Sequence, residues 1–300
     1  MGCDKVNIED FLRDCAQRVD QFLEKRLPVG GPVRLQEALR YGVIGGGKKL
    51  RASLLFATCE AYNLAQEKLL PLAGAIEMIH SFSLAHDDLP CMDNDDFRRG
   101  KPSMHRAFGE AMGVLAGDAL LIEGLSLFLT DAQFLHTFGA AKIIEITQLL
   151  LAALGVQGMV GGQVWDLEYE KKRVTEEEVR KIYLAKTARF IQFPILSGAI
   201  LGGADQKERE ILGKFGLQLG VCFQAKDDIL DVTEESSTLG KTAGKDLEQD
   251  KATLIKVKGL QRAQEFMWEE FDQAVTLLSE LERPFPRLLA VARLIVERSH

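Results

Sequence analysis

The chain has 300 residues, of which 46% are hydrophobic and 27% are charged, and its formal net charge is −7. These values are ordinary for a soluble globular protein and leave ample apolar material for a core. The negative net charge argues against the broad basic surface with which nucleic-acid-binding proteins attract phosphates. We therefore expect no nucleic acid among the partners of this chain.

The cysteines lack the paired spacing of a disulfide framework or a zinc site; they are Cys3, Cys15, Cys59, Cys91 and Cys222. Free thiols fit a reducing compartment, so we expect a cytoplasmic protein. The N-terminal residues are charged from Asp4 onward and lack an apolar signal core. No run of about 18 uncharged apolar residues occurs, which predicts that the chain has no membrane span.

Apolar residues recur every three or four positions in two long stretches, residues 69–88 and 208–231, as they do in buried helices. These positions are Leu72, Ile76, Ile79 and Phe82 in the first stretch and Ile211, Phe215, Leu219 and Cys222 in the second. Residues 103–193 contain no proline, which leaves room for several long helices between them.

Loop signals are short and do not divide the chain into separate domains. The sequence "TEEE" at 175–178 has the form of a helix capping box, and the strongest loop candidate is the polar, Gly- and Ser-containing stretch 233–246. Alternating, strand-like segments are scarce. We predict one all-α domain over residues 1–300, a helical bundle of roughly ten or more helices.

The first long helix ends in an acidic cluster, "HDDLPCMDNDDFRRG", at residues 86–100. Asp87 and Asp88 close the helix, because Pro90 disfavours the helical conformation of the residue before it. A spacing of six residues does not keep Asp87 and Asp93 on one helical face, so the intervening segment must bulge to turn Asp93 back toward Asp87. The cluster does not fit an EF-hand, since Arg98 stands where the sharp turn needs glycine.

The second long helix ends in the same way, with "KDDILD" at residues 226–231. Asp227 and Asp231 are four residues apart, which places them about 6 Å apart on one helical face. Like charges at this spacing destabilise a helix slightly, so helix stability does not account for them. A hard cation such as Mg²⁺ does, because it takes carboxylate oxygens and also accepts oxygens from a phosphate group. A solvated acidic helix end is the alternative.

Cationic residues lie beside these carboxylates. Arg98 and Arg99 follow the first cluster, and "GGGKKLR" at 45–51 places three cations behind three glycines. The latter nearly matches a phosphate-binding P-loop, but Lys49 stands where Ser or Thr is required and no strand precedes it. The remaining interpretations are a helix N-terminus that binds phosphate and a solvated basic turn.

In order along the chain, these motifs resemble those of the trans-type isoprenyl diphosphate synthases, the polyprenyl synthetase family. The resemblance covers nearly the whole chain and is strongest for the bacterial farnesyl diphosphate synthases, or geranyltranstransferases. The matching motifs are "GGKKLR" (46–51), "EMIHSFSLAHDDLPCMDNDDFRRGKPSMH" (77–105), "LAGDALL" (115–121), "GMVGGQVWDL" (158–167), "YLAKTARF" (183–190), "FQAKDDILDVT" (223–233) and "LGKTAGKD" (239–246).

This resemblance implies an antiparallel helical bundle around a deep central cavity, and a homodimer. It implies the head-to-tail condensation of isopentenyl diphosphate with an allylic diphosphate, dimethylallyl or geranyl, assisted by three Mg²⁺ ions. The implied metal ligands are Asp87, Asp93 and Asp227, with Asp88 and Asp231 as further candidates. The implied partners of the allylic diphosphate are Arg98, Lys186 and Lys241, and those of isopentenyl diphosphate are Lys48, Arg51, His80 and Arg99. Gln163 and Asp166 match a polar pair that faces the active site, and Thr187 and Gln224 match positions near the reacting carbons.

Phe82 lies five residues before Asp87, about 7–8 Å along a helix axis. An aromatic residue there resembles the floor of synthases whose product stops at fifteen carbons. The motif "DDLPCMDNDD" also resembles plant-type geranylgeranyl diphosphate synthases, which usually carry a smaller residue at the position of Phe82. The sequence thus favours farnesyl diphosphate as the product and keeps geranylgeranyl diphosphate as the alternative.

The sequence departs from the family pattern at Lys49, which replaces a usual arginine, at Ala52, and after Thr253, where Tyr-Pro is missing. Three other classes of protein are alternatives to a prenyl synthase. A terpene cyclase would carry a different second acidic motif, and a non-catalytic subunit of a larger synthase tends to lose the aspartates, which are intact here. A plain metal-binding scaffold explains the aspartates and leaves the cations unexplained.

Overall fold

The computed structural model describes residues 8–233 and 250–298. Apart from one hairpin of two-residue strands, the regular structure of these residues is helical, which confirms the predicted all-α class. The described residues form two compact units: one contains residues 8–56 and 64–140, and the other contains 57–63, 141–233 and 250–298. The expectations of a single domain and of a deep central cavity stay predictions.

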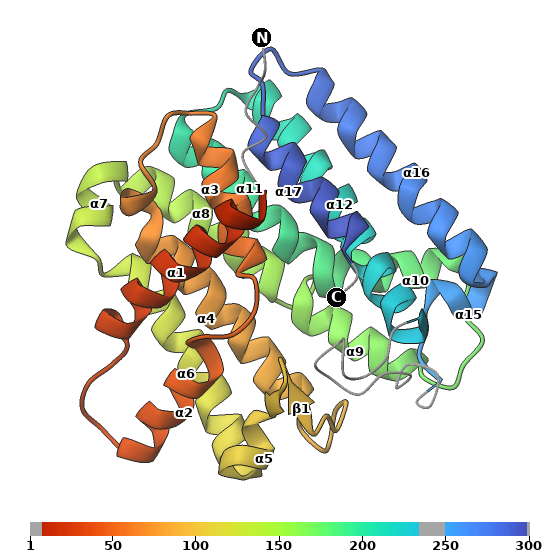
Figure 1. The fold of residues 1–300 in the computed structure, drawn as a ribbon, viewed down its shortest axis with the longest axis horizontal. Helices are drawn as coiled ribbons and strands as arrows, with labels where there is room; N and C mark the ends of the chain where they lie inside the picture. The colour runs from red at the N-terminus through yellow and green to blue at the C-terminus, as the bar shows by residue number, and fades with distance from the viewer. Residues whose placement is uncertain (1–7, 234–249, 299–300) are drawn as a thin grey trace. The chain divides into compact units, whose positions relative to one another are not determined.

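The first unit is built around α4, with α6 packed along it (Figure 1). Its elements are α1 (Ile8–Arg26), α2 (Val33–Val43), the start of α3 (Leu50–Glu60), the 3₁₀ helix η1 (Gln66–Leu69), α4 (Leu70–Asp87), β1 (Phe97–Arg98), β2 (Lys101–Pro102), α5 (Met104–Phe108), α6 (Glu110–Leu129) and α7 (Ala132–Phe138). Nearly every residue of α4 up to Ile79 is buried, whereas Phe82, the last of the predicted apolar positions, is half-buried.

The second unit is built around α12, which packs against α11 and α16 (Figure 1). Its elements are α8 (Ala140–Leu154), α9 (Met159–Tyr169), α10 (Glu176–Ile182), the π-helix η2 (Tyr183–Ala188), α11 (Arg189–Gly202), α12 (Gln206–Thr233), α15 (Leu254–Lys258), α16 (Leu260–Ser279) and α17 (Pro286–Glu297). The apolar positions predicted for α12 are all buried, from Ile211 to Cys222.

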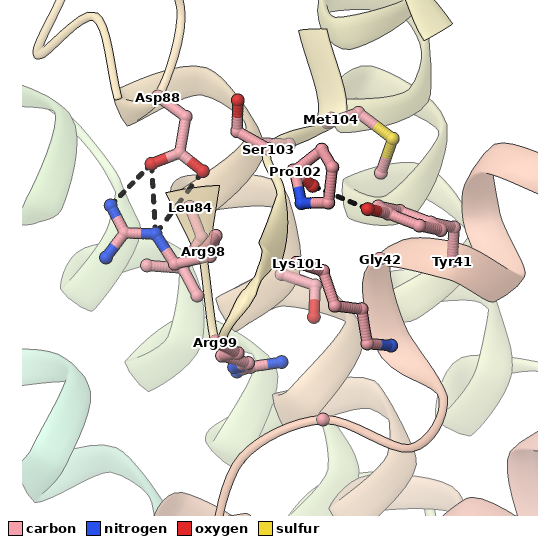
Figure 2. A pocket seen from close by; sticks show the side chains of 13 residues that line it. Tyr41, Gly42, Leu84, Asp88, Arg98, Arg99, Lys101, Pro102, Ser103 and Met104 are labelled. Carbon is pink, nitrogen blue, oxygen red and sulfur yellow. Dashed lines mark hydrogen bonds and ion pairs between the residues drawn. The ribbon is translucent and has the colours of Figure 1, made fainter. Parts of the chain in front are cut away.

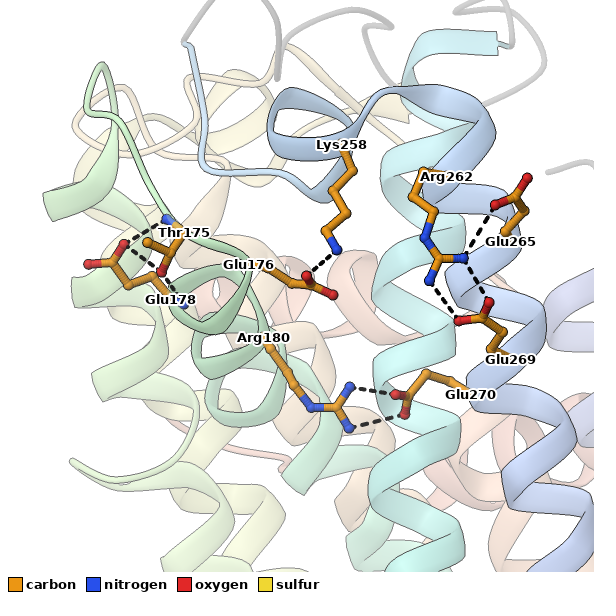
Figure 3. A network of polar contacts seen from close by, with 9 residues as sticks. All are labelled: Thr175, Glu176, Glu178, Arg180, Lys258, Arg262, Glu265, Glu269 and Glu270. Atoms are coloured by element: carbon orange, nitrogen blue, oxygen red, sulfur yellow. Dashed lines mark hydrogen bonds and ion pairs between the residues drawn. The ribbon is translucent and has the colours of Figure 1, made fainter.

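The predicted capping box is present at the start of α10, where Thr175 and Glu178 exchange hydrogen bonds. Figure 3 shows this cap beside an ion pair, in which both Nη atoms of Arg180 donate to Glu270 at 2.5 and 3.1 Å. The pair joins α10 to the buried side of α16. It holds α10 in place directly before the first residue of η2, the element on which several candidate functional residues lie.

Two helical stretches, Glu110–Leu129 and Ala140–Glu168, are long and apolar enough to cross a membrane by length and composition alone, a test that core helices also pass. Among the described residues, four cysteines are free thiols, with Cys91 exposed and Cys15, Cys59 and Cys222 buried.

Candidate functional site

The turn after α4 has the predicted bulge. Asp87 is the last residue of α4, and the amide of Asp93 donates to the carbonyl oxygen of Asp87 at 2.8 Å. The amide of Asp95 likewise returns to the carbonyl of Asp88 at 3.2 Å. The chain therefore folds back on the end of the helix and holds Asp93 beside Asp87, although the two residues are six positions apart.

Asp88 forms an ion pair with Arg98 in the hairpin that follows this turn (Figure 2). The Nε of Arg98 donates to both carboxylate oxygens, at 3.0 and 3.3 Å, and its Nη2 lies 3.2 Å from Asp95. Burial raises the pKa of Asp88 above its ordinary value, and the charge of Arg98 opposes this shift. Because the Asp88 side chain is 1% exposed, this geometry favours a role in holding the hairpin over its suggested role as a metal ligand.

Arg99 points away from Asp88 (Figure 2). It forms the hairpin turn with Gly100, and both residues have positive φ, 54° and 73°, as a tight two-residue hairpin turn requires. The guanidinium of Arg99 lies against the glycine loop before α3, where a Cβ on Gly47 would come within 2.9 Å of Nε. Burial lowers the pKa of Arg99, and the nearby carboxylate of Glu77 opposes this shift.

Arg51 and His80 lie together in the same unit, with Arg51 Nη1 3.2 Å from His80 Nε2. Since an arginine only donates, Nε2 accepts and the proton of the neutral ring is on Nδ1, a buried atom without a hydrogen-bond partner among the described residues. Burial and the charges of Arg51 and Arg99 lower the pKa of His80 well below its ordinary value. Arg51, Arg99 and a neutral His80 thus form a cationic cluster suited to an anion.

The two lysines before α3 differ in their surroundings. Lys48 is exposed, whereas Lys49 is buried, donates to the carbonyl oxygen of Val43 and lies 3.3 Å from a carboxylate oxygen of Asp20. The departure from the family pattern at Lys49 therefore falls on a residue that anchors the loop to α1. Lys48 stays the residue of this pair that could contact a ligand.

The second acidic cluster places its carboxylates in different environments near the end of α12. The Asp227 side chain is 38% exposed, whereas Asp228 and Asp231 are buried. Asp227 accepts a hydrogen bond from Arg298, whose guanidinium also lies over the Phe223 ring, 4.2 Å from its centroid. Among these three aspartates, Asp227 offers the most accessible oxygens, in line with its predicted part in metal binding.

Asp228 belongs to a hydrogen-bonded network that orients Thr187 and Gln224. Tyr183 donates its phenolic proton to Asp228, and the Gln224 amide nitrogen donates to the same carboxylate at 3.1 Å. The Gln224 oxygen then accepts from the Thr187 hydroxyl at 2.6 Å. Because an ionised carboxylate only accepts, Asp228 fixes which way the Gln224 amide points.

Lys186 and Asp166 form an ion pair at 2.6 Å, and Lys251 Nζ lies 4.0 Å from the same Asp166 oxygen. The backbone of η2 comes so close to α9 here that a Cβ on Gly162 would lie 2.3 Å from the Lys186 amide nitrogen. Gln163, next to this glycine, has buried amide atoms without a hydrogen-bond partner among the described residues. Lys186 and Lys251 therefore both lie within ion-pair distance of the same oxygen of Asp166.

The donor set for a metal ion is carboxylate. Across residues 8–233 and 250–298, no three His, Cys, Asp or Glu side chains converge into a preformed metal centre. The partly exposed carboxylates of Asp87, Asp93 and Asp227 fit Mg²⁺, a hard cation that binds few protein oxygens, keeps waters and takes phosphate oxygens from a substrate.

Several predicted residues are thus brought together in pairs: Asp87 with Asp93, Arg51 with His80, Lys186 with Asp166, and Thr187 with Gln224. Lys241 lies outside the described residues.

Two residues of the candidate site, Tyr183 and Arg298, were not predicted from the sequence. Tyr183 is the first residue of a recognised motif, 183–190, and that position was the available signal; Arg298 had none, because its partner is 71 residues away.

Comparisons with known proteins agree with these motifs. A family model described as polyprenyl synthetase matches residues 32–281. The large subunit 1 of the heterodimeric geranylgeranyl pyrophosphate synthase of Arabidopsis thaliana, a chloroplastic protein, is 41% identical over 292 residues, which cover 95% of this chain and 78% of that protein. Farnesyl diphosphate synthase of Bacillus subtilis (strain 168) is 39% identical over 269 residues, 90% of each chain.

A solved structure is also similar over the whole chain. The crystal structure of a geranyltransferase from Helicobacter pylori, complexed with magnesium and isoprenyl diphosphate, has a TM-score of 0.85 and 29% identity, and covers 98% of both chains. The chain therefore belongs to the polyprenyl synthetase family of prenyltransferases.

Proposed function

We propose that the chain is a Mg²⁺-dependent farnesyl diphosphate synthase, which condenses isopentenyl diphosphate with dimethylallyl and then geranyl diphosphate. The proposed product length is based on the position of Phe82. This residue lies on α4 five residues before Asp87, about 7.5 Å along the helix axis. An aromatic ring at that depth limits the length of an apolar tail whose diphosphate is held at Asp87. The similarity to the Bacillus subtilis enzyme supports this product.

Isopentenyl diphosphate is assigned to the cationic cluster of the first unit. Arg51 and Arg99 provide guanidinium groups, which suit phosphate oxygens because they donate in pairs. His80 stays neutral beside them, since its pKa is low, and so adds no charge of its own. Lys48 is exposed just before α3 and supplies a further cation. Arg98 is already paired with Asp88, which makes a contact to the allylic diphosphate secondary to its place in the hairpin.

The allylic diphosphate is assigned to the aspartates, through Mg²⁺, and to lysine. Asp87, Asp93 and Asp227 would hold the ions, and Lys186, with Lys241 outside the described residues, would contact the diphosphate. Bound Mg²⁺ supplies the charge that lets diphosphate leave. An apolar lining of the predicted cavity would keep water from the allylic cation that results, and Thr187 and Gln224, which are hydrogen-bonded to each other, would present oriented dipoles to it.

Carbon–carbon bond formation then follows from the double bond of isopentenyl diphosphate, which attacks the allylic carbon. The final proton is assigned to the released diphosphate, because no His or Glu is placed for this step by the motifs. The residues of the chain thus bind and orient the two substrates, and the leaving group acts as the base.

Geranylgeranyl diphosphate is the second candidate product. The specific observation in its favour is the 41% identity to the Arabidopsis thaliana protein, a large subunit of a heterodimeric geranylgeranyl pyrophosphate synthase. Phe82 distinguishes the candidates, since a chain extended to twenty carbons needs room beyond that ring. A terpene cyclase and a non-catalytic subunit are disfavoured by the intact second acidic motif.

We further propose a homodimer. Helix α6 carries exposed apolar residues, Val114, Leu115 and Ile122, and a symmetric interface would bury them. The free cysteines support a cytoplasmic location. Light scattering at micromolar concentration tests the dimer, and Ile122→Lys, which places a charge in the proposed interface, is expected to shift the mass toward the monomer.

One assay tests the reaction. Purified protein is incubated with radiolabelled isopentenyl diphosphate, Mg²⁺ and either dimethylallyl or geranyl diphosphate, and the products are separated by chain length. A fifteen-carbon product that disappears with a chelator supports the proposal. Asp87→Ala and Asp227→Ala are expected to lower the rate by orders of magnitude with unchanged helicity. No Mg²⁺-dependent elongation would contradict the proposal, and a twenty-carbon product would select the second candidate.

A further inference from the structure

His86 lies at the contact between α4 and α6, one residue before Asp87. Its Nε2 lies 3.0 Å from the carbonyl oxygen of Val114 and 3.7 Å from a carboxylate oxygen of Asp118. Since a carbonyl only accepts, Nε2 carries a proton and donates to Val114. These contacts hold the imidazole against the backbone of α6, one turn beyond Phe82 on the same face of α4.

Gly117 makes this position of the imidazole possible. A Cβ at Gly117 would come within 2.2 Å of His86 Nε2 and 2.3 Å of Cδ2. Side-chain carbons are not found so close to other heavy atoms, so any larger residue must displace the ring. The His86 side chain is 25% exposed and the neighbouring Asp118 side chain is 56% exposed, so a displaced imidazole can move toward solvent. A glycine in the middle of a helix is less stable than an alanine. The contact with His86 explains why a glycine is nevertheless present at position 117 of α6.

His86 in turn contacts the ring of Phe82. The two rings meet edge to face, with centroids 5.0 Å apart and planes at 77°. Residues four apart on a helix are neighbours, so the imidazole covers one side of the phenyl ring and restricts its rotamers. Gly117, His86 and Phe82 therefore form a stack that runs from the backbone of α6 to the residue proposed to limit the product.

We infer that Gly117 is a positioning residue for product length: by admitting the His86 imidazole against α6, it fixes the Phe82 ring that stops the growing chain. The inference rests on the proposed function, because it deepens the role given there to Phe82. A larger residue at 117 displaces His86 toward solvent and leaves Phe82 without its neighbour. The ring then has freedom to turn aside and let a longer tail pass.

The test compares Gly117→Ala with Gly124→Ala in the assay for product length. Gly124 is the matched control, because it lies on the same face of α6 and packs on α4 through Ile79, away from His86. We expect Gly117→Ala to raise the share of products of twenty or more carbons by roughly tenfold, the scale on which a pocket discriminates a small apolar group. Gly124→Ala is expected to keep the wild-type distribution.

His86→Ala, alone and combined with Gly117→Ala, shows whether glycine is needed only because of the imidazole. We expect His86→Ala to lengthen the product as well. Without the imidazole a Cβ fits at position 117, so the double variant should have the product length of His86→Ala and a melting temperature no lower. If Gly117→Ala lowers the melting temperature equally with and without His86, the inference is wrong.

A binding measurement keeps the inference testable without turnover. The unreactive analogues geranyl and farnesyl S-thiolodiphosphate differ by one isoprene unit, and Gly117→Ala is expected to improve the affinity for the farnesyl analogue relative to the geranyl one. A wild-type protein that makes no prenyl product refutes the proposed function, and the analogue ratio then still decides the inference. Unchanged product length and an unchanged analogue ratio in Gly117→Ala overturn it, as would a shorter product.

Discussion

Both carboxylate oxygens of Asp88 accept hydrogen bonds from Arg98, so the aspartate that follows α4 is bound to the hairpin ten residues later. Asp87, its neighbour, is the proposed metal ligand. Adjacent aspartates of one motif thus have separable roles, one in the folded loop and one in the reaction.

The two roles predict opposite results for substitution by asparagine. Asp88→Asn removes the charge that balances a largely buried guanidinium, and we expect it to lower the free energy of unfolding by about 2–4 kcal/mol. Asp87→Asn is expected to lower the rate by orders of magnitude with little change in stability. Urea unfolding and the elongation assay measure both. Asp96→Asn is the control, because its ion pair with Arg106 is exposed to solvent and is expected to add little to stability. Equal losses of stability for Asp88→Asn and Asp96→Asn would contradict this assignment.

Tyr183→Phe removes the hydroxyl that joins Asp228 to the amide of Leu254. We expect the free energy of unfolding to fall by about 1.5–3 kcal/mol, the range for a hydrogen bond to a charged group. Because Asp228 orients Gln224 and, through it, Thr187, we also expect kcat to fall while KM for both substrates changes little. A rise in KM with unchanged kcat would show that the network acts on binding and not on the reacting groups.

Arg298 competes with a metal ion for Asp227, since its guanidinium already binds one carboxylate oxygen. We expect Arg298→Ala to lower the Mg²⁺ concentration at half-maximal rate by about two- to tenfold, which corresponds to an ion pair of about 0.4–1.4 kcal/mol. Arg287→Ala, which removes a pair with Glu60, serves as the control. A higher Mg²⁺ requirement in Arg298→Ala would mean that Arg298 supports the site instead.

His80 makes stability depend on pH. In the unfolded chain a histidine takes up its proton near pH 6.5, whereas burial and Arg51 lower the pKa of His80 in the folded protein. Below about pH 6.5 the unfolded state therefore binds more protons, and stability falls as the pH falls, by at most about 1.4 kcal/mol per pH unit. Urea unfolding measures how far the free energy of unfolding decreases from pH 7 to pH 5.5. This decrease should be smaller for His80→Asn than for the wild type or for His136→Asn, a control at an exposed histidine.

Phe82→Ala is expected to lengthen the product, because it removes the ring proposed to limit the tail. The elongation assay with geranyl diphosphate measures the change, and Phe82→Tyr, which keeps an aromatic ring, is expected to retain the fifteen-carbon product. If Phe82→Ala leaves the product distribution unchanged, the limit lies elsewhere in the chain and the stack with His86 has no bearing on it.

The sequence was sufficient for the two long helices and for contacts between neighbours in the chain. The buried positions of α12, the cap at Thr175 and the return of Asp93 to Asp87 all depend on local spacing, and the structure confirms them; α4 is buried on all sides up to Ile79, which its spacing alone did not indicate. The all-α class follows from the same patterns. Of the site, residues within one motif could be named from their order alone.

What the sequence did not reveal depends on contacts between distant elements. The π-helix η2 is an example: a Cβ on Gly162 or Gly220 would come within 2.3 Å of its backbone, so two helices approach it through glycines. No spacing within residues 183–188 indicates that approach. The pairing of Arg98 with Asp88, and of Arg298 with Asp227, likewise requires the fold to be known.

The two-residue turn at Arg99 and Gly100 pairs Arg98 with Lys101 across the hairpin. Arg98 is the last residue of β1 and pairs with Asp88, whereas Arg99 is the first residue of the turn and lies against the glycine loop. Insertion or deletion of a single residue would change the turn and so the position of the Arg99 guanidinium. The length of this hairpin is therefore as strictly constrained as its charges, and swapping loops between family members should succeed only when that length is kept.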